Sequence, residues 1–165
     1  MIANKISFVF FALTLSIFSY SEDKETHLLC LAKNIYHEAR GEPVEGQMAI
    51  SNVVINRVKS KRFPNDICSV VYQKNQIAFI NRILEIIPVN IPGCQFSWTC
   101  DSKPDDLFID KTAWENSQKI AEEVLNGLHH DLSEGATHYH SVFIDPHWAD
   151  SLNETVVIGE HIFYK

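Results

Sequence analysis

The sequence predicts an α+β domain in which helices come first and a small antiparallel sheet follows near the C-terminus. The chain has 165 residues, a length typical of one domain, and a hydrophobic content of 45%, which is that of a packed globular protein. Apolar residues recur at helical spacing early in the chain, whereas its last part is rich in aromatic and β-branched side chains. Helices followed by strands are typical of this fold class.

The first 21 residues are typical of a signal peptide. Lys5 precedes an apolar run, and two small serines stand just before an acidic pair. We therefore expect residues 1–21 to be removed on export and residues 22–165 to form the mature domain, in the periplasm or outside the cell. An uncleaved membrane anchor is the alternative, but the apolar run is shorter than the roughly 20 residues that span a bilayer. No stable membrane span is expected after removal.

Four helices are expected in the mature domain, each with a stripe of apolar residues or a recognisable cap. Their spans are His27–Arg40, Pro43–Arg62, Asp66–Tyr72 and Asp110–Gly127. Two strands are expected at Ala136–Val142 and Val156–Tyr164, joined by a loop around Trp148. The apolar stretch Ile77–Pro92 is interpreted as additional core, with a flap over a binding cleft as the functional alternative.

Four cysteines lie in the exported part of the chain, so an oxidised pair of bridges is expected. Three pairings are possible. We favour Cys30 with Cys68 and Cys94 with Cys100, because the second pair is local and leaves the first to join two early helices. The formal net charge of −7 argues against a nucleic-acid partner, whose phosphates would be repelled.

Titratable side chains gather at the end of the first expected helix, beside a glycine turn. Glu38 lies four residues after Asn34, at the edge of the apolar stripe rather than opposite it. A carboxyl buried in that way has a raised pKa, as a general acid near neutral pH needs. On this pattern alone, a solvated charge or an arginine partner is the simpler interpretation. Glu42 is expected at the surface.

Several ordered motifs resemble the SleB-type cell wall hydrolases, a family that includes the spore-cortex-lytic enzymes. The segment around Glu38 carries the resemblance together with the residues that follow it. The matching stretches are residues 34–42, 46–58, 64–73, 94–98, 135–140, 146–148 and 161–164. They cover nearly all of the mature chain. The sequence departs from the family in the inserted Ile77–Pro92 stretch and in Glu160, where a small or neutral residue is more familiar.

The resemblance implies a lysozyme-like catalytic domain in which Glu38 is the essential acid. It implies cleavage of peptidoglycan between N-acetylmuramic acid and N-acetylglucosamine. In lytic transglycosylases the 6-hydroxyl of the muramic acid attacks its own anomeric carbon, so one Glu suffices as acid and then base. No cofactor and no metal are expected. Anchoring to the wall is expected from the domain itself or from an accessory wall-binding protein.

Sugar rings pack on aromatic faces while their hydroxyls seek polar side chains, which nominates residues near the motifs for substrate binding. They are Tyr36, Gln95, Ser97, Trp98, His138, Tyr139 and His140. For Phe96 and Trp148 we favour a place in the core. For Trp98 and Tyr139 we favour the cleft.

Other functions fit parts of the sequence. His138 and His140 point to one side of an expected strand and, with His147 or His161, would make the three-histidine zinc site of an amidase or peptidase acting on the stem peptide. A Cys-His peptidase is disfavoured because all the cysteines have expected partners. A non-catalytic wall-binding module would keep the aromatic residues without needing Glu38. A muramidase would need a second base, for which the candidates are Glu42, Asp101 and Asp145.

Overall fold

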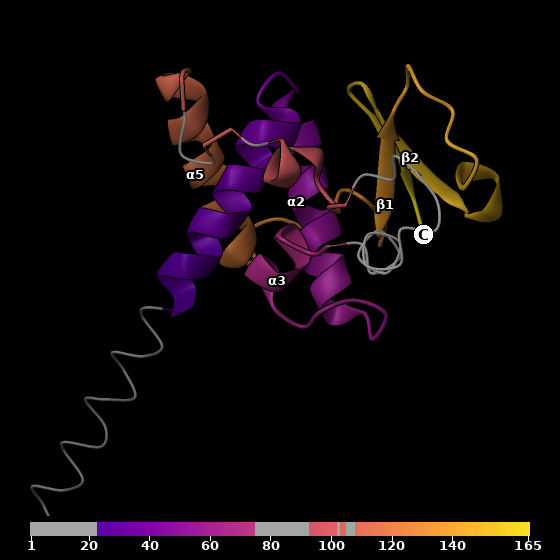
Figure 1. Ribbon diagram of the computed structural model, residues 1–165, viewed down its shortest axis with the longest axis horizontal. Helices are drawn as coiled ribbons and strands as arrows, with labels where there is room; N and C mark the ends of the chain where they lie inside the picture. Colours follow the sequence, from indigo (N-terminus) through magenta and orange to yellow (C-terminus); the bar gives the residue numbers. More distant parts are fainter. Residues whose placement is uncertain (1–22, 75–92, 102, 105–107) are drawn as a thin grey trace, which may run out of the picture.

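The domain has helices on one side and a three-stranded antiparallel sheet on the other (Figure 1). The computed structural model describes residues 23–74, 93–101, 103–104 and 108–165. The expected signal peptide and the Ile77–Pro92 stretch lie outside these ranges. The arrangement confirms the predicted fold class, mainly helical with a small sheet near the C-terminus.

Four α-helices lie within the described ranges. The first covers residues 23–39, and the others are α2 (Val44–Lys59), α3 (Ile67–Val71) and α5 (Lys111–Leu125). Asp66 and Asp110 act as the N-caps of α3 and α5, because their side chains accept the backbone N–H groups of Ser69 at 2.8 Å and Ala113 at 3.0 Å. Two short 3₁₀ turns cover Ser97–Cys100 and Ala149–Ser151.

Helix α2 is the central element of the domain. Its Met48 and Val54 join a core cluster with the first helix, α3 and α5, whereas Ala49, Ile50 and Val53 pack with Phe163 of the sheet. The helix is therefore buried on nearly every side, so its polar residues must find partners inside the protein. Asn56 does so by donating to Asp131, Ser133 and the carbonyl oxygen of Ala136 in the segment that leads into β1.

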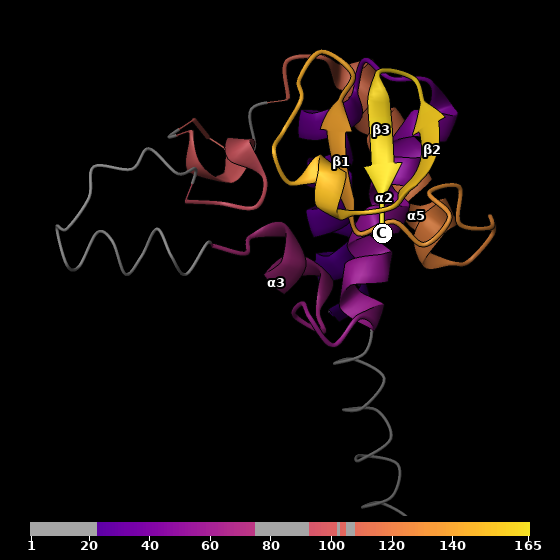
Figure 2. The same cartoon turned by 90° about the vertical axis from the view of Figure 1, so that its right-hand side faces the viewer.

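The sheet consists of β1 (His138–Ser141), β2 (Glu154–Ile158) and β3 (His161–Tyr164), in the order β1-β3-β2, and Figure 2 views it with the helices behind it. The prediction of one strand over Val156–Tyr164 was wrong, because this segment is a hairpin. The chain turns at Gly159, whose φ of +58° is readily available only to glycine, and at Glu160. A glycine between two alternating apolar runs is a hairpin signal that the sequence offered.

Alternation along the strands divides the sheet residues between two faces. Tyr139, His161 and Phe163 face the helices, with the ring centres of His161 and Phe163 lying 5.3 Å and 5.8 Å from that of Tyr139. His140 and Tyr164 lie on the outer face, where their rings stack at 5.2 Å. We call these the inner and outer faces of the sheet.

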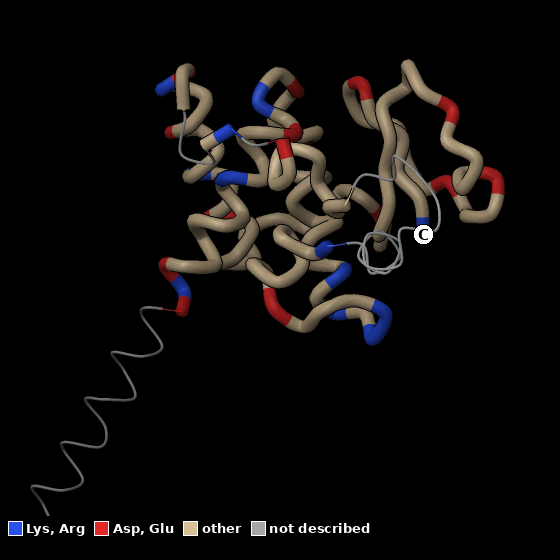
Figure 3. Tube along the Cα trace, viewed as in Figure 1, with Lys and Arg blue, Asp and Glu red and all other residues tan. Residues whose placement is uncertain are grey.

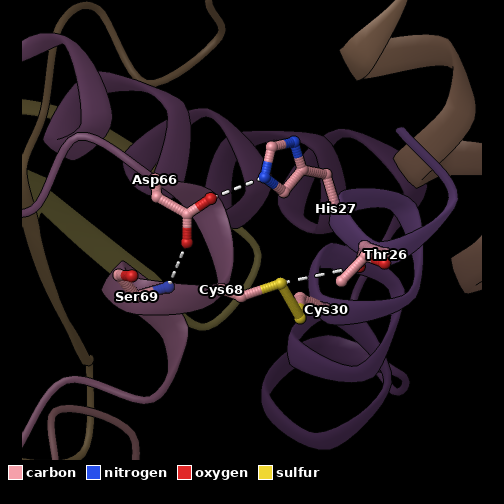
Figure 4. Close-up of polar contacts among 6 residues, drawn as sticks. All are labelled: Thr26, His27, Cys30, Asp66, Cys68 and Ser69. Carbon is pink, nitrogen blue, oxygen red and sulfur yellow. Dashed lines mark hydrogen bonds and ion pairs between the residues drawn. A yellow bond between two sulfur atoms is a disulfide. The ribbon is translucent and has the colours of Figure 1, made fainter. Parts of the chain in front are cut away.

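Both predicted disulfides are confirmed. Cys30–Cys68 ties the first helix to α3, and Cys94–Cys100 closes a short loop. Beside the first bridge, Figure 4 shows the carboxylate of Asp66 in contact with the ring of His27 and the backbone of Ser69. Burial would raise the pKa of Asp66, but the hydrogen bonds from Ser69 and His27 outweigh it and lower that pKa.

Charges are unevenly spread over the domain (Figure 3). Basic residues gather at the end of α2 and in the turn that follows it, whereas the loop between β1 and β2 carries Asp145 and Asp150 and no Lys or Arg. Within the described part of the chain, no helix is long and apolar enough to cross a membrane.

Candidate active site

Glu38 and Tyr139 meet where the last turn of the first helix faces the sheet. The phenol of Tyr139, on the inner face of β1, donates to Oε2 of Glu38 at 3.0 Å. Burial raises the pKa of Glu38, and this effect exceeds the opposing influences of the Tyr139 hydrogen bond and the Arg57 charge. The carboxyl is therefore held in a setting that favours its protonated form, which a general acid requires.

The positive charge of Arg57 acts on both members of this pair. The residue is only 2% exposed, and its Nε donates to the carbonyl oxygen of Thr137 at 2.7 Å, just before β1. Its guanidinium lies 5.2 Å from the ring centre of Phe63 and 5.5 Å from that of Phe96. Burial lowers the pKa of Arg57 to about 10, so it remains charged at neutral pH. Its charge offsets part of the rise in the pKa of Glu38.

Gln95 covers the terminal nitrogens of Arg57. A guanidinium has donors and no acceptor, so the amide oxygen of Gln95 must be the atom that faces it. In this orientation the oxygen accepts from both terminal nitrogens, at 3.2 Å each. Gln95 is itself exposed, which distinguishes it from the buried guanidinium beneath it.

The structure separates His138 and His140 from the Glu38–Tyr139 pair. Both histidines lie against Trp148 on the outer face, with ring-centre distances of 5.6 Å and 5.5 Å. The Nε2 atom of His140 hydrogen-bonds the Tyr164 hydroxyl at 2.9 Å. Burial, with the charges of Arg57 and Arg62, lowers the pKa of His138 to about 4. The charge of Arg57 therefore acts on His138 as well as on Glu38.

Tyr36, Ser97 and Trp98 lie together at a different place on the first helix. They line a cavity of about 490 Å³ with Arg40, and Glu38 is not among its lining residues. The Tyr36 hydroxyl accepts the backbone N–H of Asp110 at 3.0 Å, which ties it to the start of α5.

The aromatic expectations are met in part. Phe96 is a core residue at 3% exposure, as expected. Trp98, for which the cleft was favoured, is 6% exposed and packs in the same core cluster while bordering the cavity described above. Its ring stacks on that of His37 at 4.5 Å. Trp148, expected in the core, is only partly buried. The role of these residues in substrate binding remains a prediction.

The expectation that Glu42 is a surface residue was wrong. Its side chain is 10% exposed, and its Oε2 accepts the backbone N–H of Glu160 at 2.9 Å and lies 3.6 Å from Nδ1 of His161. The β2–β3 turn closes over this carboxylate because Gly159 has no side chain to displace it. A helix-end glutamate followed by proline gives no sequence signal of that long-range contact.

The three-histidine hypothesis loses its geometric basis. His161 lies on the inner face and His138 and His140 on the outer face, so these three rings do not converge. Over the described residues, which include His147, no group of three or more His, Cys, Asp or Glu side chains is arranged to hold a metal ion.

Sequence reasoning missed Arg57 as a member of the site. The available signal was a polar cluster inside an otherwise apolar helix, since Asn52, Asn56 and Arg57 stand among buried residues of α2. Such a cluster requires buried partners, but the sequence does not say that the partners adjoin the carboxyl of Glu38.

Solved structures share this fold. The chain resembles the catalytic domain of a germination-specific lytic transglycosylase, SleB, from Bacillus anthracis, with a TM-score of 0.56 and 26% identity over 84% of this chain and 93% of that one. It is similarly close to the catalytic domain of the Bacillus cereus SleB protein, with a TM-score of 0.56 and 25% identity over 86% of this chain and 91% of that one. The fold is therefore that of SleB catalytic domains.

The family follows from the sequence match. Residues 41–164 match the Cell Wall Hydrolase family model, and the chain belongs to this family. Among curated relatives, a spore cortex-lytic enzyme from Halalkalibacterium halodurans is 29% identical over 81% of this chain. One from Bacillus subtilis strain 168 is 51% identical over 26% of it. The chain spans 33% and 14% of their respective lengths. Glu38 lies just before the matched range.

Proposed function

We propose that this protein cleaves the glycan strand of peptidoglycan between N-acetylmuramic acid and N-acetylglucosamine as a lytic transglycosylase. The observation that carries the proposal is the Glu38 carboxyl, whose pKa is raised by burial and which Tyr139 holds by a hydrogen bond of 3.0 Å. The family match and the likeness to a structure described as a germination-specific lytic transglycosylase support the same substrate class.

In the proposed reaction Glu38 acts twice. Its protonated carboxyl first gives a proton to the glycosidic oxygen as the bond from that oxygen to the muramic anomeric carbon breaks. The muramic 6-hydroxyl then bonds to the same carbon and returns its proton to the Glu38 carboxylate. The product is a 1,6-anhydro ring, no water is consumed, and the acid is regenerated. Tyr139 keeps the carboxyl oriented through both steps.

The settings of the other candidate carboxylates favour this intramolecular nucleophile over an activated water. Asp145 lines a cavity along the outer face of the sheet, together with His140 and Tyr164. Asp101 borders the cavity that contains Tyr36 and Trp98. Glu42 is occupied by the backbone of Glu160. An enzyme that hydrolyses the bond needs a second base to activate water, and none of these three carboxylates is joined to the Glu38–Tyr139 pair by a hydrogen bond of the described residues.

The proposed site of action is outside the cytoplasm. Two disulfides are compatible with an oxidising compartment, and residues 1–21 supply a candidate export signal. Tyr139 bonds to Glu38 and Gln95 bonds to Arg57, so these two are the proposed substrate contacts with the most direct structural support. A neighbouring part of the glycan or its stem peptide is proposed to bind at Tyr36, Ser97 and Trp98. Substrate is also proposed to contact His138 and His140 at β1.

The experiment that tests the proposal is fragment release from purified sacculi by Glu38→Gln. We expect turnover to fall by about two to four decades with the fold intact, the usual contribution of a positioned acid or base. Glu115→Gln is the matched control. Glu115 is exposed on α5 beside Lys111, and its substitution makes the same change in charge. Normal activity of Glu38→Gln would overturn the proposal.

Two further outcomes have separate meanings. A greater loss in Glu42→Gln than in Glu38→Gln would reverse the roles assigned to the two carboxylates. Release of free stem peptides from intact glycan, abolished by a chelator and restored by zinc, would replace the glycosidic reaction with an amidase reaction.

A further inference from the structure

The Gln95 side chain is exposed, but its backbone is held by a hydrogen bond and by the buried residues before and after it. Its N–H donates to the carbonyl oxygen of Gln73 at 2.8 Å. Cys94 before it is disulfide-bonded and 7% exposed, and Phe96 after it is 3% exposed in the core. The segment therefore presents one polar side chain from a rigid support, which is how binding sites reduce the entropy cost of ordering a contact.

The orientation of the Gln95 amide is fixed as well. Arg57 cannot rotate freely, since its Nε is bonded to Thr137 and its guanidinium is packed near Phe63 and Phe96. It holds the amide oxygen with two donors at 3.2 Å each. The NH₂ group of that amide cannot bond to the guanidinium, because both groups have only donors. With its oxygen bonded to Arg57, the exposed Gln95 side chain keeps its two N–H donors for another partner.

The same guanidinium links Gln95 to the acid. Arg57 donates to the carbonyl oxygen of Thr137, two residues before the Tyr139 that donates to Glu38, so hydrogen bonds connect the Gln95 amide to the start of the strand that holds the acid. A pair of fixed donors beside a glycan-cleaving acid fits a neutral carbonyl oxygen of the substrate. Both sugars of the strand carry such an oxygen in the acetamido group at carbon 2.

The geometry points to Gln95 as a specificity residue that reads the 2-acetamido carbonyl of a bound sugar, with Arg57 as the positioning residue that orients its amide. This inference rests on the proposed glycan cleavage and adds the group by which the strand is recognised. It predicts discrimination against strands whose acetamido groups have been replaced by amines, because an ammonium group has no acceptor for the Gln95 donors.

Gln95→Glu is the informative variant. It keeps an oxygen for Arg57 but replaces the outward donors with an acceptor, which suits an ammonium and repels a carbonyl oxygen. Gln118→Glu on α5 adds the same charge away from the sheet and is the control. Gln95→Met removes both donors and acceptors at similar size. The substrates are one preparation of glycan chains, fully acetylated or de-N-acetylated, with a re-acetylated sample to exclude damage, at a mildly acidic pH that keeps the amines protonated.

We expect wild-type protein and Gln118→Glu to favour acetylated chains in kcat/KM by about tenfold or more, the scale of one lost hydrogen bond to substrate. Gln95→Met should lose most of this preference, and Gln95→Glu should reverse it. In both variants the change should appear in KM rather than in kcat. An active Gln95→Glu that retains the wild-type ratio would overturn the inference while leaving the proposed function intact. A folded wild type that releases fragments from neither substrate would overturn the proposed function, and the inference with it.

Discussion

The two faces of the C-terminal sheet carry similar side chains in different settings. On the inner face, Tyr139 donates its phenol to a carboxylate that comes from a helix. On the outer face, the hydroxyl of Tyr164 bonds to His140 of the neighbouring strand at 2.9 Å. One tyrosine therefore completes a candidate catalytic pair, whereas the other ties one strand to the next. The contrast shows that the packed element decides the role of each tyrosine. Tyr139 faces the first helix and its Glu38, whereas Tyr164 faces His140 on the neighbouring strand.

The largest effect should separate the two tyrosines. Tyr139→Phe should lower kcat by about tenfold or more, because Glu38 loses the hydrogen bond that orients it. That bond also lowers the pKa of Glu38. Its removal should raise this pKa further and move the basic limb of the pH–rate profile to higher pH. Fragment release measured across pH tests both effects.

Tyr164→Phe is the matched control for this prediction. It removes the same atom from the outer face, so its cost should fall on stability, by about 1 kcal/mol, with the pH–rate profile unchanged. Equal losses of activity in the two variants would contradict the separate roles assigned to Tyr139 and Tyr164.

The β2–β3 turn offers a second way to test the inner face. A methyl group added at Gly159 would meet Oε2 of Glu42, and the residue would keep a φ of +58° that side chains disfavour. Gly159→Ala should therefore cost roughly 1–3 kcal/mol in chemical denaturation. Gly41→Ala is the control, because nothing lies within 4 Å of its added methyl group. An unchanged unfolding midpoint for Gly159→Ala would mean that Glu42 does not hold the turn.

The smallest expected effect is on stability, and it comes from burying the charged form of Glu38. Burial raises its pKa in the fold above the unfolded value, so the native state binds the proton more tightly, and stability declines as pH rises through the folded pKa. Glu38→Gln should therefore raise the melting temperature at neutral pH by a few degrees while removing activity. The gain should shrink at acidic pH, where the carboxyl is already protonated. A lower melting temperature at neutral pH would contradict the assigned environment.

The fold was largely predictable because its signals are local. Apolar periodicity located the helices, and the expected spans Asp66–Tyr72 and Asp110–Gly127 begin at the two observed N-caps, because capping depends on residues three positions apart. The disulfide pairing also followed from spacing. The hairpin within Val156–Tyr164 was missed although Gly159 marked it, because a long β-rich run concealed a tight turn.

The site was predictable only at its centre. Glu38 and Tyr139 were nominated through family motifs, but their contact joins residues 101 positions apart. Arg57 and Glu42 were missed for the same reason, since each is defined by partners far along the chain: Thr137 for Arg57 and Glu160 for Glu42. Local pattern indicates which residues are polar, and tertiary packing decides which of them meet.

The most direct test of the central claim is the mass of the fragments that the wild-type protein releases from purified sacculi. If Glu38 works with the muramic 6-hydroxyl, the fragments end in 1,6-anhydro rings and lack one water, about 18 daltons, relative to hydrolytic ends. Reducing ends at muramic acid would contradict the account and require a second base that activates water.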